Sequence, residues 1–119
     1  MTDQQLRYEM MTLLAAGFET TATALSWFFH FVLGSPECLT KLLNENTKAQ
    51  VDGRVPLAEV DQLKYLDAAI KETLRVQAVA PHISRLLVAP KKVGTLELPK
   101  GVMVLGSIYL TQRRADLFE

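Results

Sequence analysis

The first third of the chain is a nearly continuous apolar run. Met10 to Leu33 carries a single acidic residue and no basic one. A capping box precedes this run, since Thr2 is followed three residues later by Gln5. Gly34 follows it, at the place where a helix-ending glycine is expected. The pattern predicts one long helix over residues 1–34, and a helix that is apolar on all sides belongs in a core.

Polar and apolar positions then alternate with helical spacing. Ser35 and Pro36 combine an N-cap serine with proline at the first helical position, so a second helix is predicted from there to about Thr47. Pro56 opens a short helical stretch. It leads into "KYLDAAIKETLRVQ", which has an apolar stripe on one side and a charged stripe on the other. Residues 35–80 are therefore predicted to be a helical segment.

The pattern changes after Pro81. The stretches "SRLLVA", "GTLEL" and "GVMVLGSI" are short, rich in branched residues and separated by proline and glycine, which predicts small strands. "LPKG" predicts a tight turn between two of them, and "QRRADLFE" predicts the start of a further helix. We expect a mainly α fold with a small β portion. Residues 1–119 would form a single partial domain with parts 1–34, 35–80 and 81–119.

Composition excludes several classes of function. The chain has 119 residues, 49% of them apolar, with 13 basic and 13 acidic side chains and one cysteine. This charge balance argues against nucleic acid as a partner. One cysteine cannot form an internal disulfide or a multi-thiolate zinc site. The polar start lacks a secretory signal, so we expect a cytoplasmic protein and leave open a membrane anchor upstream.

The middle of the apolar run is unusual for a core or membrane helix. The run is long enough to cross a bilayer, but Glu19 at its centre would cost roughly 2.5–3.5 kcal/mol there. Gly17 weakens a helix by about 1 kcal/mol relative to alanine. Thr20 can bond back to the preceding turn and bend the helix. Local rules broken so close together indicate a functional site; the alternative is a packing glycine and a half-exposed glutamate.

Several segments resemble one family. "AGFETT" (Ala16–Thr21) is similar to the A/G-G-x-D/E-T-T/S motif in the central helix of the cytochrome P-450 superfamily, the heme-thiolate monooxygenases. Glu72 and Arg75 in "KETLR" match the family's E-x-x-R motif. "PHISR", "LELPKGVMV" and "RRADLF" resemble segments that follow in the same order. Together they cover essentially the whole chain and imply a partial P-450 fold.

The resemblance implies roles for residues of the central helix. In the family this helix crosses the distal face of the heme. Ala16 and Gly17 would line the oxygen groove beside the cofactor. Glu19 and Thr20 would be the acid–alcohol pair that delivers the protons needed to activate dioxygen. The cofactor performs the oxidation, and the protein places the proton.

The resemblance also implies roles beyond this helix. Glu72 and Arg75 would brace the proximal side as a structural pair, and the position of Glu72 off the charged stripe predicts that it is buried. Arg85 would meet a heme propionate. The substrate pocket would be lined by Val79, Ala80, His82 and Ile83. The sequence departs from the family at "VQAVAP" and at Gln112, which leaves the substrate open.

Cys38 imitates the family's ligand motif. Phe31, Gly34 and Cys38 read F-x-x-G-x-x-x-C, but this stretch precedes E-x-x-R, whereas the family's motif follows it. Thr20 to Leu33 alone spans about 20 Å of helix, too far for a thiolate that must bind the iron opposite Thr20. We therefore expect Cys38 to be a packing or surface cysteine, no metal ligand in the chain, and a heme ligand supplied from elsewhere.

Taken as implied by the resemblance, the chain is a piece of an oxidoreductase, inactive alone, that inserts one oxygen atom from O2 into a small apolar organic substrate. Its cofactor is heme, and its electron donor is a ferredoxin, a flavodoxin or a reductase. Some relatives rearrange peroxides instead, but they lack the acid–alcohol pair that Glu19 and Thr20 supply. A non-catalytic helical interaction module or membrane-associated segment remains the alternative from another class.

Overall fold

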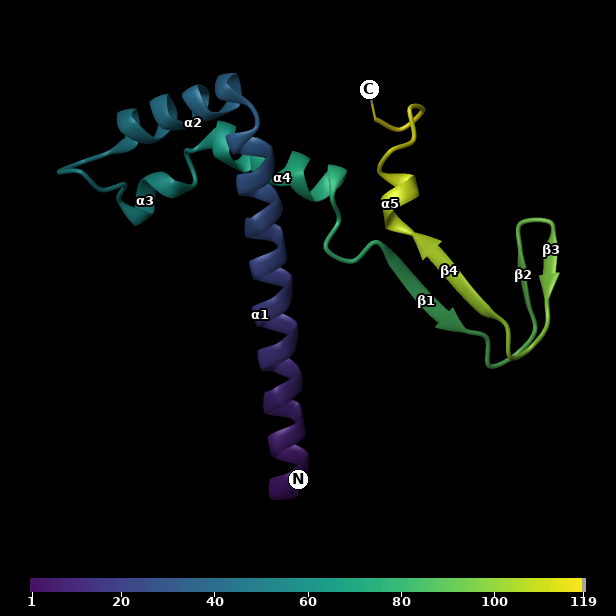
Figure 1. Cartoon of the computed structure of the whole chain (residues 1–119). Helices are drawn as coiled ribbons and strands as arrows, with labels where there is room; N and C mark the ends of the chain where they lie inside the picture. The colour runs from purple at the N-terminus through teal and green to yellow at the C-terminus, as the bar shows by residue number, and fades with distance from the viewer. Residues whose placement is uncertain (119) are drawn as a thin grey trace. The chain divides into compact units, whose positions relative to one another are not determined.

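The computed structural model describes residues 1–118, which are mainly helical with a small share of strand (Figure 1). The chain divides into two compact units, residues 1–74 and residues 75 onward, where the sequence analysis treated it as one partial domain. The first unit holds the helices α1 to α3 and most of α4. The second holds the strands and α5, and each unit is described by itself.

Helix α1 spans Asp3–Leu33, 31 residues without a break. The predicted capping box is present: the Gln5 amide donates to Thr2 Oγ1 at 3.2 Å, and the Thr2 amide donates to Gln5 Oε1 at 2.8 Å. The helix ends as predicted at Gly34. This glycine has a right-handed φ of −76°, and an added Cβ would lie 3.2 Å from the His30 carbonyl oxygen. Space, not backbone handedness, therefore favours glycine here.

The prediction that α1 is a core helix is wrong for these residues. Its side chains are exposed from residue 3 to residue 22, and Val32 is its one buried residue. A helix is buried only by a second layer, and within residues 1–74 that layer covers the last turns alone. No helix among residues 1–118 combines the length and apolarity of a membrane span.

Helix α2, Pro36–Ala49, starts where the sequence predicts and ends two residues later than expected. After a turn, in which Gly53 has a φ of +76°, come α3, Leu57–Val60, and α4, Lys64–Val76. Apolar side chains of all four helices line one groove that includes Val32 and Leu63, the two buried hydrophobic residues of the described chain. This groove is the core of the first unit.

The second unit contains two antiparallel strand pairs. β1, His82–Leu86, pairs with β4, Met103–Ser107, and β2, Lys91–Val93, pairs with β3, Leu96–Leu98. The predicted turn after β3 is confirmed, with Gly101 at a φ of +88°.

Two details of this unit differ from the sequence prediction. Strand β2 was not predicted. A further helix was predicted to start within residues 112–119, but residues 112–118 are not helical. Helix α5 lies earlier, at Ile108–Thr111, where the Ser107 hydroxyl caps it by accepting from the Leu110 amide at 3.2 Å. Residues 115–117 form a turn, and Glu119 lies outside the described residues.

Candidate functional site

Four candidate residues lie together near the middle of α1. Ala16, Gly17, Glu19 and Thr20 are all exposed. The Thr20 hydroxyl donates to the Ala16 carbonyl oxygen at 2.6 Å, the bond to the preceding turn that the sequence predicts. The helix continues unbroken through this stretch, so the threonine bond does not interrupt it.

Gly17 leaves a bare strip on this helix. A Cβ added there would meet no atom within 4 Å. Glycine is therefore not required by packing inside the described chain, although it weakens the helix relative to alanine by about 1 kcal/mol. Ala16 beside it adds only a methyl group.

Glu19 and Thr20 do not face one another. Successive residues of an α-helix are separated by about 100° around its axis, so the two side chains leave the helix in different directions. The Thr20 bond is also not unique, because Thr12 donates to the Tyr8 carbonyl at 2.9 Å and Ser26 to the Ala22 carbonyl at 2.8 Å. What distinguishes Thr20 is its neighbours Gly17 and Glu19, not its own hydrogen bond.

Glu72 and Arg75 lie three residues apart on α4. Arg75 is half-buried, and its Nη1 donates to the Gln112 carbonyl oxygen at 2.7 Å. The Arg75 guanidinium carbon also lies 5.5 Å from the centre of the Phe118 ring. The sequence predicted a buried Glu72, but Glu72 is exposed; the buried polar residue of α4 is the next one, Thr73. Because Glu72 and Thr73 are adjacent, their side chains leave the helix about 100° apart, one exposed and one buried.

Strand β1 carries three further candidates. Side chains of successive strand residues point to opposite faces, so Ile83 and Arg85 share one face and His82 occupies the other. All three are exposed, and Arg85 donates from Nη1 to the Ser84 carbonyl at 2.8 Å. Val79 and Ala80 lie in the segment before β1. His82 and Ile83 therefore cannot both face one pocket from a regular strand.

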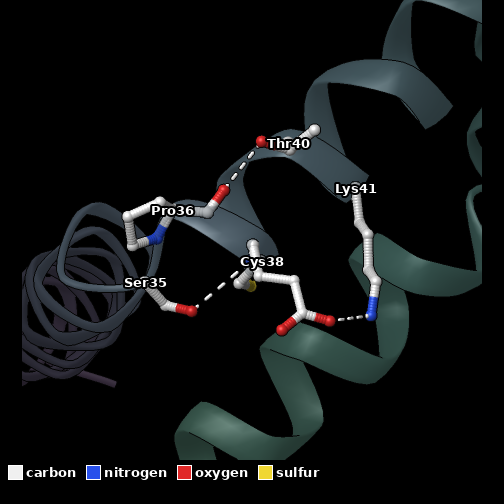
Figure 2. Close-up of polar contacts among 6 residues, drawn as sticks. Ser35, Pro36, Cys38, Thr40 and Lys41 are labelled. Carbon is white, nitrogen blue, oxygen red and sulfur yellow. Dashed lines mark hydrogen bonds and ion pairs between the residues drawn. The ribbon is translucent and has the colours of Figure 1, made fainter.

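Cys38 sits in the first turn of α2 (Figure 2). Its amide donates to the Ser35 hydroxyl at 3.4 Å, which is the N-cap bond. Its half-buried thiol interacts with the hydroxyl of Tyr65, and this hydrogen bond raises the pKa of Tyr65. No cluster of metal-ligating side chains occurs in residues 1–118. The expectation of a packing or surface cysteine stays a prediction, and the thiol is half-buried.

The contact that Glu45 makes with α4 was not predicted from the sequence. The Glu45 carboxylate accepts hydrogen bonds from the backbone amides of Tyr65 and Leu66, at 2.8 Å each. No spacing rule could have found this pair of bonds, because the donors are backbone groups 20 and 21 residues away. Glu45 thereby joins α2 to the first turn of the helix that carries Glu72 and Arg75.

The described residues fit part of a heme site. The bare strip at Ala16 and Gly17 suits the face of a porphyrin, and the exposed guanidinium of Arg85 suits a propionate. Cys38 is the one thiol of the chain, and its interaction with Tyr65 raises the pKa of that tyrosine. The two sets of candidates belong to different units.

Comparison with known proteins shows which family the chain is similar to. The family model described as "Cytochrome P450" matches residues 1–119. The chain is 38% identical over 118 residues to "Putative cytochrome P450 135B1" of Mycobacterium tuberculosis (strain ATCC 25618 / H37Rv), covering 99% of this chain and 24% of that protein. It is 35% identical over 119 residues to "Cyclooctatin synthase" of Streptomyces melanosporofaciens, covering 99% of this chain and 26% of that protein.

A mammalian relative is similar over nearly the same stretch. "Cytochrome P450 4A6" of Oryctolagus cuniculus is 35% identical over 111 residues, which cover 92% of this chain and 22% of that protein. The chain thus spans about a quarter of the length of the curated relatives it matches.

Proposed function

This chain belongs to the cytochrome P450 family, and from that premise we propose that it supplies the distal helix and the E-x-x-R helix of a heme-thiolate monooxygenase. The reaction is insertion of one oxygen atom from O2 into a small apolar organic substrate. The observation that carries the proposal is the order of the two motifs: Ala16–Thr21 lies in the middle of one long helix, and Glu72 and Arg75 share a later one.

On this proposal, residues of α1 prepare the distal side. Heme, when bound, supplies the iron chemistry that activates dioxygen. Ala16 and Gly17 let the helix backbone approach the ring, since neither has a long side chain. Thr20 can turn its hydroxyl from the Ala16 carbonyl toward oxygen and donate its proton there. Glu19 replenishes that proton through water, because the two side chains do not face each other.

Other residues hold the cofactor and the substrate. Arg85 pairs with a propionate through its exposed guanidinium, and Glu72 with Arg75 braces the proximal side. Val79, Ala80, His82 and Ile83 remain the candidate pocket residues. Strand alternation means that either His82 or Ile83, not both, faces the substrate from β1.

The partners follow from this chemistry. A monooxygenase needs two electrons from outside, so a ferredoxin, a flavodoxin or a reductase donates them. The iron ligand would be a cysteine thiolate other than Cys38, because Cys38 precedes the E-x-x-R motif whereas the family's ligand motif follows it.

A chimera tests the proposal. Residues 1–119 would replace the matching stretch of the mycobacterial relative, which is 38% identical here. We expect the purified chimera, reduced and exposed to carbon monoxide, to show the Soret band typical of thiolate-ligated heme. The 119-residue chain mixed with hemin should not show it. A folded chimera without the band would contradict the proposed function, and the band in the chain alone would contradict our assignment of Cys38.

The exposure of α1 favours one alternative, a helical interaction module without catalysis. Its large apolar side chains, including Leu13, Leu14 and Phe18, are exposed over the first two thirds of the helix, and surfaces of this kind bind other surfaces. The same chimera separates the two functions. An interaction module has no reason to retain heme, and a substitution of Glu19 or Thr20 should not alter its binding.

A further inference from the structure

One side of α2 faces the beginning of α4. Cys38, Lys41 and Glu45 follow one another at intervals of three and four residues, which places them on one face of the helix. All three contact Tyr65. The Cys38 thiol interacts with its hydroxyl, the Lys41 ammonium lies 5.8 Å from the centre of its ring, and Glu45 accepts from its amide. Of these contacts, the hydrogen bond to Glu45 is the one that fixes the Tyr65 backbone.

The Glu45 carboxylate provides hydrogen-bond acceptors for the first amides of α4. The first amides of any helix have no acceptor inside the helix, and a nearby Ser, Thr, Asp or Asn usually supplies one. Helix α4 begins at Lys64 and is preceded by Leu63, whose side chain cannot accept a hydrogen bond. Glu45 supplies both missing acceptors, with Oε1 receiving the Tyr65 amide and Oε2 the Leu66 amide, each at 2.8 Å.

We propose that Glu45 is a positioning residue that fixes the start and direction of the helix bearing Glu72. A carboxylate that binds two successive amides fixes direction as well as distance, because both oxygens must meet their donors together. The negative charge at the positive end of the α4 dipole adds to this attraction. Glu72 lies about two turns further along the same rigid helix. The consequence for heme rests on the proposed function, whereas the contact with α4 does not.

Site-resolved hydrogen exchange of the 119-residue chain tests the contact. In Glu45→Ala we expect the Tyr65 and Leu66 amides to exchange roughly tenfold faster, the effect of losing a helix cap. Glu45→Gln keeps one acceptor oxygen, so one of the two amides should stay protected. Glu37→Ala is the matched control: Glu37 lies on the same helix and pairs with Lys41 at 2.7 Å. It should leave both amides unchanged.

Three results would overturn the proposal. The first is fast exchange of both amides in the unaltered chain. The second is an equal effect of Glu37→Ala. The third concerns the heme-loaded chimera, in which we expect Glu45→Ala to lower the ratio of heme to protein severalfold. A ratio that Glu45→Ala leaves unaltered would contradict the proposal, and Glu37→Ala is measured as the control. If the unsubstituted chimera binds no heme, the proposed function fails, and the amide measurements still decide whether Glu45 holds α4.

Discussion

Replacing Thr20 with alanine separates a structural role of this side chain from a chemical one. Thr20 and Thr12 occupy the same kind of place: both lie on α1, both are exposed, and each donates its hydroxyl to the carbonyl four residues earlier, at 2.6 and 2.9 Å. They differ in their neighbours, since only Thr20 stands beside the Gly17–Glu19 stretch. Thr12→Ala is therefore the control for Thr20→Ala.

The structure predicts that both substitutions have the same small effect on stability. A carbonyl inside a helix already accepts a backbone hydrogen bond, so the threonine bond is a second one and its loss costs little. Alanine favours the helix over threonine by roughly 0.5 kcal/mol. We expect the free energy of unfolding to change by less than about 0.5 kcal/mol in either variant. Urea unfolding of the 119-residue chain, followed by circular dichroism, measures this change.

The chemical effect should distinguish the two variants. In the heme-loaded chimera, loss of a proton donor at the reacting oxygen removes a contribution of about 10²–10⁴ in rate. We expect Thr20→Ala to form at least roughly tenfold less product per O2 consumed, whereas Thr12→Ala couples normally. Thr20→Ser keeps the hydroxyl and should restore coupling. Equal coupling in the two alanine variants would refute the role of Thr20.

Two further predictions concern α2 and its contacts. Ser35→Ala removes the N-cap bond and should destabilise the chain by about 0.5–1 kcal/mol. Ser26→Ala, in mid-helix, should stabilise the chain by a few tenths of a kcal/mol. If both variants shifted the urea unfolding midpoint in the same direction, this prediction would be wrong. The Glu37–Lys41 pair lowers the pKa of Glu37 below its ordinary 4.5 and raises that of Lys41 above its ordinary 10.5. Helicity from this pair should therefore be complete between those values, fall as the pH drops below 4.5 and fall again above 10.5. Glu37→Gln should reduce the acid limb of the circular dichroism titration.

Local chemistry made the helix starts predictable. The capping box at Thr2 and the serine–proline pair at Ser35 involve donors and acceptors within three residues of each other, so the sequence contains both partners side by side. The same holds for Gly101, whose positive φ follows from the turn in "LPKG". These features require no knowledge of what packs against the chain.

Elements that depend on distant partners were not predictable in the same way. β2 is three residues long and exists through its pairing with β3. Arg75 binds the Gln112 carbonyl across 37 residues. The Glu45 contact is of this kind too. In each case one partner is a backbone group, which carries no trace in the sequence.

The motif residues themselves were found from the sequence, but their surroundings were not. The sequence predicts burial of α1, because fully burying a side chain such as Phe or Leu stabilises a protein by about 1.5–3 kcal/mol. In the structure Phe18 is 74% exposed and Leu14 is 73% exposed. On the proposed function, the cofactor and further protein would cover this helix. Glu19 and Thr20 then become polar groups inside an apolar layer, where an unpaired polar group is costly. Water and oxygen held beside them would satisfy those groups, so the covering that makes the two residues unfavourable is also what gives them a function.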